Sequence, residues 1–375
     1  MGLTLLGGLS PRAFLARHWQ RRPLVVRGAL PRFRDPVRAT VLFGLAARED
    51  VESRVARRHA GRWTLAHGPF ERAALARLPA SGWTLLVQGV NHFVPEVDRM
   101  MRRFAFASFA RLDDVMVSYA APRGGVGPHL DSYDVFLIQG AGARRWQIAR
   151  PRAYRLDARA PLRILADFRP EQEWVLEAGD LLYLPPGWAH DGVALAPCLT
   201  YSIGFRAPTA QELAVGYLQF LEDRLARPGR YTDPGLAPQR HPARLGDDLI
   251  ERYARLLHGM PGARTDIVEY LGRHLSEPKP HVRFARPSPP LGMARFVRAA
   301  RRRGIRLAGA TIMLYRRSRF YVNGESVTVR AHRLLLARLA DRRVLDPGIL
   351  PAGDVGALLY NWYRYGYLAP GESDG

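Results

Sequence analysis

Short apolar runs separated by turn-forming residues dominate the middle of the chain. Clusters of Gly, Pro, Asn and Asp bound these runs, and such clusters end strands. The runs lie at 115–120, 133–139, 145–149, 174–176, 181–184 and 199–205. Several short strands at this spacing predict a sandwich or jelly roll.

The residues ahead of these runs predict a mixed lead-in. Ser10 followed by Pro11 is typical of a helix start, because serine caps the first turn and proline fits the first helical position. Apolar residues at 23–27 and 83–88 predict two strands, and the pattern at 94–104 predicts a helix.

After residue 208 the apolar positions repeat with helical spacing. Helices are expected over 211–226, 247–257 and 265–275. Stretches rich in Pro and Gly at 228–242 and 278–290 predict a loop and a linker.

The last part of the chain combines helices with a hairpin. Asn323-Gly324, inside the β-rich stretch 320–329, suits a two-residue type I′ turn. Helices expected near 293–303, 331–341 and 356–365 surround it, which predicts a small winged-helix-like domain. The predicted domains of this 375-residue α+β chain are 1–208, 209–285 and 286–375.

Three side chains in the strand region have the types that hold a metal ion. His129 and Asp131 are two positions apart, so on a strand they face the same way. His190 follows the rigid corner 185–187 (PPG), which fixes the backbone ahead of it. Two imidazoles and one carboxylate on one side of an ion form the facial triad of non-haem Fe(II) oxygenases.

Five stretches around this triad carry a family resemblance: GGVGPHLDSYDVFLIQ at 124–139, GARRWQ at 142–147, WTLLVQ at 83–88, DDVMVS at 113–118 and YSIGFRAP at 201–208. Together they resemble the JmjC-type ribosomal oxygenases, and most closely their bacterial branch. The resemblance implies a double-stranded β-helix of the cupin class, with the metal inside its wider mouth. It also implies a 2-oxoglutarate co-substrate and a helical region that joins two protomers, for which packing against the barrel is the alternative.

The same resemblance assigns residues to the co-substrate. Its remote carboxylate needs a cation, and Arg144 matches the expected position, whereas Arg145 is the rival because neighbouring strand residues face opposite ways. Ser118 matches a position that hydrogen-bonds the co-substrate, with its neighbour Tyr119 as the alternative. The remaining candidates are Thr200 and Ser202 as further pocket residues, and Tyr133, Asp134 and Asp191 as residues that orient the ligands.

The charge of the chain is unusual. The net charge is +22, and only one of the 56 basic residues is a lysine, Lys279. Arginine codons are GC-rich, so base composition explains part of this excess, but such a surface attracts polyanions such as RNA whatever its origin. The segment 293–345 alone has 14 arginines against Glu325 and Asp341.

No apolar run approaches the roughly 18 residues of a membrane span, and the single cysteine, Cys198, excludes an internal disulfide framework. We therefore expect a cytoplasmic protein.

The expected activity is Fe(II)- and 2-oxoglutarate-dependent hydroxylation of an arginine in a large-subunit ribosomal protein of the L-sixteen type. A histidine target, as in the eukaryotic relatives, is the alternative within the family. Two alternative functions lie outside the family: a non-catalytic cupin, and a nucleic-acid-binding regulator whose barrel has no catalytic role. Because the substrate is itself basic, acidic groups near the mouth would have to recognise it, and the nearest in sequence are Asp113, Asp114 and Asp134.

Overall fold

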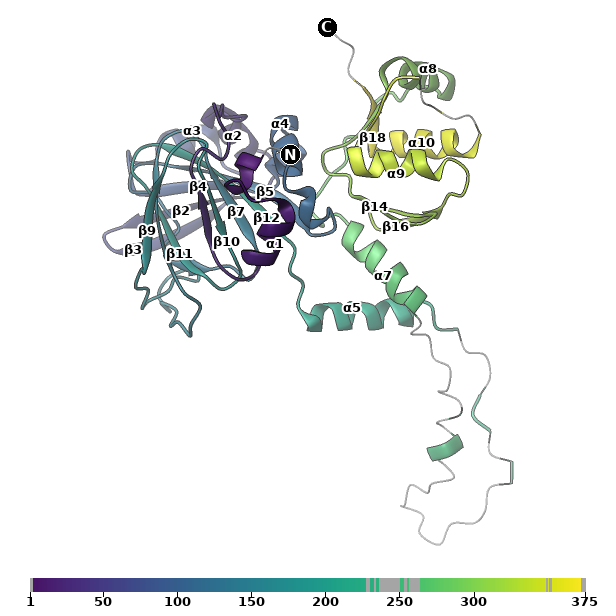
Figure 1. Cartoon of the computed structure of the whole chain (residues 1–375), viewed down its shortest axis with the longest axis horizontal. Helices are drawn as coiled ribbons and strands as arrows, with labels where there is room; N and C mark the ends of the chain where they lie inside the picture. The colour runs from purple at the N-terminus through teal and green to yellow at the C-terminus, as the bar shows by residue number, and fades with distance from the viewer. Residues whose placement is uncertain are drawn as a thin grey trace.

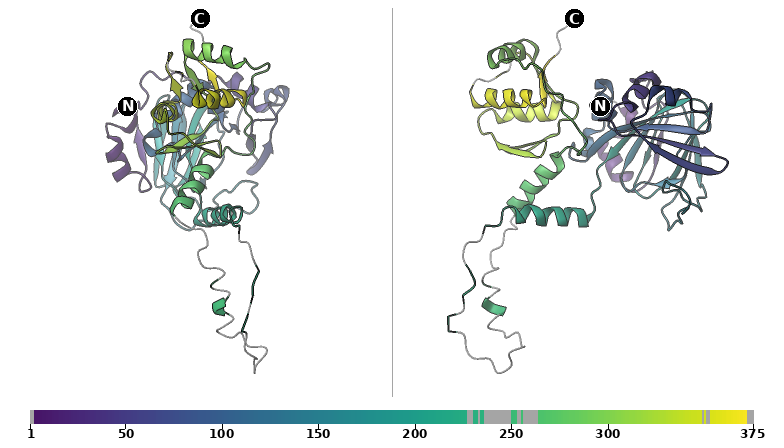
Figure 2. Two further views of the ribbon diagram at one scale, coloured as in Figure 1. Left: turned by 90° about the vertical axis from the view of Figure 1, so that its right-hand side faces the viewer. Right: turned by 180° about the vertical axis from the view of Figure 1, so that it is seen from behind.

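The computed structural model describes residues 3–226, 264–348 and 353–371, together with 230–232, 234–235, 250–252, 255 and 350. A β-barrel forms one end of the described chain and a smaller α/β domain the other, and two helices, α5 and α7, connect them (Figures 1 and 2). No helix among these residues is long and apolar enough to cross a membrane.

The barrel consists of two antiparallel sheets. The larger has the order β1 (Leu24–Val26), β10 (Leu181–Leu184), β7 (Val135–Gln139), β12 (Cys198–Phe205), β5 (Leu112–Ala120), β4 (Trp83–Val87), β2 (Ser53–His59) and β3 (Arg62–His67). The smaller has the order β6 (His129–Leu130), β11 (Ala189–Ala194), β8 (Arg144–Ala149) and β9 (Gln172–Leu176). The predicted jelly-roll fold is therefore confirmed.

An apolar cluster shows that the two sheets pack face to face. Leu137 and Leu182 of the large sheet lie in one buried cluster with Trp146, Ile148 and Leu176 of the small sheet. These residues alternate with outward-facing ones along their strands, as the pleat requires. The other face of the large sheet is covered by the lead-in helices.

The lead-in residues before β5 cover this outer face of the large sheet. The helices of the lead-in are α1 (Pro11–Arg17), α2 (Ala39–Ala46), α3 (Arg72–Ala76) and α4 (Pro95–Arg102), with short 3-10 turns η1 (Leu3–Leu6), η2 (Val90–His92) and η3 (Ala105–Ala107). Ser10 caps α1 as predicted, because the Ala13 amide donates to its Oγ at 3.1 Å. Phe14 then packs edge-on against Tyr183 of β10, with ring centroids 4.9 Å apart.

The lead-in also contains a hairpin that was not predicted. Strands β2 and β3 are joined by Ala60 and Gly61, both with positive φ. The strand β2, SRVARRH, is rich in arginine, so its period of two is hidden in a stretch that looks uniformly polar.

Two helices leave the barrel after β12. The first is α5 (Ala210–Glu222), capped by Thr209, whose Oγ1 accepts from the Glu212 amide at 3.1 Å. The second is α7 (Arg264–Ser276). The helix predicted over 247–257 falls, apart from a few positions, outside the described residues.

The C-terminal domain packs helices on two small sheets. Its elements are α8 (Met293–Arg303), β13 (Ile305–Leu307), β14 (Met313–Arg316), β15 (Arg319–Val322), β16 (Glu325–Thr328), α9 (Arg333–Arg342), β17 (Val344–Leu345), α10 (Asp354–Arg364) and β18 (Leu368–Pro370). Asn323 and Gly324 have φ of 51° and 87°, as the predicted type I′ turn between β15 and β16 requires.

Candidate active site

His129, Asp131 and His190 come together in the barrel. His190 of β11 pairs directly with His129 of β6, and Asp131 follows β6 by one residue. Asp131 Oδ1 lies 3.9 Å from His129 Nε2, and Asp131 Oδ2 lies 3.6 Å from His190 Nε2. One ligand atom from each residue lies within 4.8 Å of the others, which is the spacing that a single metal ion requires.

Backbone carbonyls orient both imidazoles. His129 Nδ1 lies 2.9 Å from the Gly127 oxygen, and His190 Nδ1 lies 3.0 Å from the Trp188 oxygen. A proton on each Nδ1 satisfies these bonds and leaves both Nε2 lone pairs facing Asp131. Burial, with His129 nearby, lowers the pKa of His190 to about 4. The imidazole is therefore neutral at physiological pH, as a metal ligand must be.

Glycine corners hold the two ligand segments together. Gly187 of the PPG corner has φ of 80° and donates its amide hydrogen to the Asp131 carbonyl at 2.8 Å. Gly125 lies so close to β11 that a Cβ would stand 2.7 Å from the Gly192 oxygen. A side chain at Gly125 would have to displace the backbone of β11, and one at Gly187 would be strained by the positive φ, so each position favours glycine for a different reason.

A cavity of about 470 Å³ opens above the triad. Arg144 of β8 lines it, is only 5% exposed, and points its guanidinium into the barrel beside Trp146. Among the described residues no acceptor reaches its Nε or Nη2. A buried guanidinium without acceptors is costly, so this one fits an anionic ligand such as a carboxylate.

Arg145, the rival for that role, faces away from the cavity. Its Nε lies 4.0 Å from Glu173 Oε2, and 40% of its side chain is exposed. The alternation along β8 therefore places Arg144 inward and Arg145 outward.

The residues with hydroxyl groups that were predicted to reach the co-substrate also differ in whether they line the cavity. Ser118 lines the cavity, whereas Tyr119 packs on the other face of the sheet against Phe43, with ring centroids 5.3 Å apart. Thr200 lies opposite Ser118 on β12, but its Oγ1 donates to Gln139 Oε1 at 3.3 Å and it does not line the cavity. Ser202, which was predicted together with Thr200 as a pocket residue, does line the cavity.

The acidic candidates lie in different environments. Asp113 and Asp114 line the cavity. Asp134 does not; it is fully buried and accepts from the Tyr183 hydroxyl at 2.6 Å and from Gln20 Nε2 at 3.0 Å. Asp134 therefore supports the packing of the lead-in on β10, and the interpretation that it serves substrate recognition at the mouth is wrong.

Two other candidates flank the triad. Tyr133 lines the cavity, and burial together with the Asp131 charge raises its pKa above the ordinary value. Asp191, next to His190, is absent from the cavity wall, and burial raises its pKa.

Sequence reasoning missed several residues of the cavity wall. They include Arg54 of the unpredicted strand β2, Gln88 after β4, Met116 of β5, and Arg163 and Ile164 in the loop between β8 and β9. The inward alternation of β5, which already contained Asp114 and Ser118, could have identified Met116. The loop residues have no pattern that marks them.

The family models match both ends of this architecture. Residues 99–213 match the JmjC domain, and residues 255–369 match the ROXA-like winged helix. The ribosomal protein uL16 3-hydroxylase of Escherichia coli is 35% identical over 335 residues, which covers 88% of this chain and 89% of that protein. The chain belongs to the JmjC-type ribosomal oxygenases.

Solved structures of this family agree over nearly the whole length. The X-ray structure of E. coli YcfD has a TM-score of 0.86 at 33% identity and covers 96% of this chain and 98% of that one. YcfD in complex with cobalt and 2-oxoglutarate has a TM-score of 0.82 over the same shares. The resemblance, which the sequence carried well only up to about residue 208, thus extends through the winged-helix domain, and the predicted fold class is confirmed.

Proposed function

We propose that this protein is an Fe(II)- and 2-oxoglutarate-dependent dioxygenase that hydroxylates an arginine side chain of the large-subunit ribosomal protein uL16. The observation that carries the proposal is one cavity containing His129, Asp131 and His190 together with the guanidinium of Arg144, whose Nε and Nη2 have no acceptor in the described part of the chain. Two oriented imidazoles and a carboxylate suit Fe(II), and they leave coordination positions for other ligands.

The side chains of the cavity have separate tasks in this proposal. Bound together, iron, dioxygen and 2-oxoglutarate supply the oxidant that inserts one oxygen atom into a C–H bond, with succinate and carbon dioxide as co-products. His129, Asp131 and His190 hold the metal, and Arg144 holds the remote carboxylate of the co-substrate. Ser118, on β5 of the large sheet, donates a hydrogen bond to the same molecule.

An arginine substrate is favoured by the acidic side of the cavity. Asp114 lines it and is 3% exposed, and Met116 and Tyr133 also line the cavity. A guanidinium could donate to the carboxylate while its aliphatic stem lies along the apolar and aromatic side chains. A histidine is shorter and uncharged at neutral pH, so it would use this carboxylate less well.

The connecting helices support a homodimer. No residue of the 13-residue helix α5 is buried, although it is amphipathic, and Leu218 and Val215 are 65% and 42% exposed. Ile267 of α7 is also 42% exposed. A second copy of the chain would cover this apolar surface. Size-exclusion chromatography with light scattering tests it, and Leu218→Glu should shift a dimer to monomer.

The charge favours a cytoplasmic site of action near ribosomal RNA. On α8, Arg295, Arg298 and Arg302 are exposed at helical spacing on the face opposite the buried Phe296. Such a strip attracts phosphates. Binding of a ribosomal RNA fragment should weaken steeply with salt, and more gently in a variant with these arginines changed to glutamine.

Mass spectrometry of peptides tests the activity. Peptides spanning the candidate arginine of uL16, with lysine and histidine replacements, would be incubated with Fe(II) and 2-oxoglutarate and examined for a gain of about 16 Da, the mass of one oxygen atom. Modification of the arginine peptide alone is expected. Modification of the histidine peptide alone would assign the eukaryotic specificity. Failure of the metal-loaded protein to bind 2-oxoglutarate would favour a non-catalytic cupin. Salt-dependent DNA binding without 2-oxoglutarate turnover would favour a nucleic-acid-binding regulator.

A further inference from the structure

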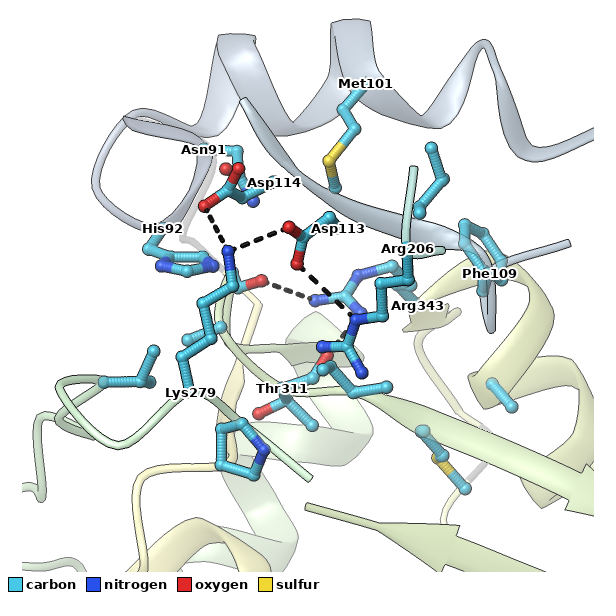
Figure 3. A pocket seen from close by; sticks show the side chains of 18 residues that line it. Asn91, His92, Met101, Phe109, Asp113, Asp114, Arg206, Lys279, Thr311 and Arg343 are labelled. Carbon is cyan, nitrogen blue, oxygen red and sulfur yellow. Dashed lines mark hydrogen bonds and ion pairs between the residues drawn. The ribbon is translucent and has the colours of Figure 1, made fainter. Parts of the chain in front are cut away.

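Asp113 and Asp114 of β5 stand in a wall between two cavities. Both line the cavity above the triad, and both also line a smaller cavity between the barrel and the C-terminal domain (Figure 3). Lys279, from the segment between α7 and α8, lines only the second cavity. The lysine therefore reaches the two carboxylates from behind and leaves the catalytic cavity open.

The contacts at this wall are specific. Lys279 Nζ donates to Asp113 Oδ2 at 2.9 Å and to Asp114 Oδ2 at 3.1 Å (Figure 3). The other oxygen of Asp114, Oδ1, accepts from Gln88 Nε2 at 2.8 Å. Arg206 Nε lies 3.5 Å from Asp113 Oδ1. Both oxygens of Asp114 are thus held, Oδ2 by Lys279 from outside the catalytic cavity and Oδ1 by Gln88, which lines that cavity.

Cations surround the two carboxylates of the wall. Lys279 and Arg206 contact them, Arg343 lines the same small cavity, and His92, whose pKa burial lowers to about 4, stays neutral. Burial lowers the pKa of Lys279, but the two carboxylates outweigh this and raise it overall. A buried charge is costly when it has no counter-ion. The lysine therefore compensates the buried charge of Asp114 from outside the catalytic cavity.

The backbone around Lys279 is held in place. Proline stands on both sides of it, at 278 and 280, and the Val282 amide donates to the Lys279 carbonyl at 2.9 Å. The C-terminal domain approaches the barrel closely beside it, since a Cβ on Gly309 would lie 2.9 Å from the Asn91 oxygen. The lysine position thus depends on how this domain sits on the barrel.

We propose that Lys279 is a positioning residue for the substrate cation: it orients the carboxylate of Asp114 from outside the catalytic cavity, and so makes substrate binding depend on the docked C-terminal domain. The proposal rests on the arginine hydroxylase function proposed above. It gives the chain's one lysine a role that the metal and co-substrate residues do not cover.

The test is a comparison of steady-state kinetics on the full-length protein. Lys279→Met is expected to raise the KM for the arginine peptide about tenfold or more, because it removes one partner of a mostly buried ion pair. The kcat and the KM for 2-oxoglutarate should stay within about twofold of wild type, since the lysine touches neither triad nor Arg144. Lys279→Arg should restore most of the affinity, and Lys279→Gln gives a second neutral variant if the methionine variant is unstable.

A matched control separates this role from simple domain docking. Glu269 of α7 accepts from Arg273 Nε at 2.8 Å, Arg319 Nε at 2.7 Å and Ser326 Oγ at 2.7 Å, and so joins α7 to the β15–β16 hairpin without contacting the acidic wall. Glu269→Gln should lower the melting temperature but leave the peptide KM unchanged.

The possible results distinguish the positioning role of Lys279 from an effect of domain docking. A wild-type KM in both neutral variants would overturn the role of Lys279, and a lowered KM would show instead that the lysine competes with substrate. An equal rise in KM in Glu269→Gln would attribute the effect to domain docking alone. If the wild-type enzyme consumed 2-oxoglutarate but hydroxylated no arginine peptide, the proposed function would fail first, and the role of Lys279 would fall with it.

Discussion

Within the described residues, the barrel and the C-terminal domain each bury one arginine, and the two arginines differ in their partners. Arg343 of the C-terminal domain donates from Nη1 to the Thr311 carbonyl at 2.5 Å, and from Nη2 to the carbonyls of Ala308 at 2.6 Å and Gly309 at 3.2 Å. Arg144 of the barrel is buried to a similar degree, yet its Nε and Nη2 meet no acceptor among the described residues.

This difference separates a structural cation from a ligand-binding one. Burying a guanidinium is costly, and three carbonyls offset that cost for Arg343 within the fold itself. The cost at Arg144 is offset only when an anion enters the cavity. A buried charge that lacks partners next to a set of metal-ligand side chains therefore points to a binding site, whereas the same residue type with partners holds a loop in place.

The largest effect should follow from removing a side chain of the triad. His129→Ala or Asp131→Ala should abolish 2-oxoglutarate turnover with added Fe(II), because three protein ligands are the minimum that this geometry offers. Both side chains are partly exposed, so the melting temperature of the metal-free protein should change little. Turnover at the wild-type rate in either variant would remove the basis for treating the barrel as a metal site.

The second largest effect is expected at Arg144, the buried arginine that lacks acceptors, and it tests whether that side chain binds the co-substrate. Arg144→Ala should raise the 2-oxoglutarate concentration needed for half-maximal turnover by about 30-fold or more, which corresponds to losing about 2 kcal/mol of a buried charge pair. Arg145→Ala, on the outer face of the same strand, is the matched control and should change it much less. A titration with the reverse order would move the co-substrate anchor to Arg145.

The sequence predicts a good part of this site because local spacing determines it. A period of two puts His129 and Asp131 on one face, and the proline-rich corner marks His190. The choice of Arg144 over Arg145 came from resemblance, and the inward orientation of Arg144 agrees with it. Strands with apolar inward residues, such as Leu181–Leu184, were located to the residue.

What the sequence could not show depends on contacts between distant segments. Whether Thr200 or Ser202 reaches the cavity depends on where β12 crosses β5 and β7, and that register is set by the whole sheet. The Lys279–Asp114 ion pair joins residues 165 positions apart. No local pattern in the sequence marks either partner.

A smaller effect, on stability, is expected from the structural arginine. Arg343→Met leaves the carbonyls of Ala308, Gly309 and Thr311 without their charged donor, and it should lower the free energy of unfolding of the C-terminal domain by about 2–3 kcal/mol. The half-saturating 2-oxoglutarate concentration should not move. Thermal unfolding and a 2-oxoglutarate titration on the same sample measure both quantities. A large loss of co-substrate affinity in Arg343→Met would contradict the assignment of Arg343 as structural and Arg144 as ligand-binding.

The smallest effect concerns pH at the contact between the two regions. The pKa of His92 is lowered from 6.5 to about 4, mainly by burial. The charges of Lys279, His281 and Arg343 also lower this pKa, whereas the charge of Asp113 raises it. Because the unfolded chain binds the proton more readily, the stability from neutral His92 is present above pH 6.5 and is lost as the pH falls towards 4. Between pH 7 and 5.5 the wild type should lose about 1 kcal/mol more than His92→Gln, which cannot titrate. Urea unfolding at the two pH values measures this, with His59→Gln, at the exposed end of β2, as the control that should behave like wild type. An equal loss in wild type and His92→Gln would show that this histidine does not link the domain contact to pH.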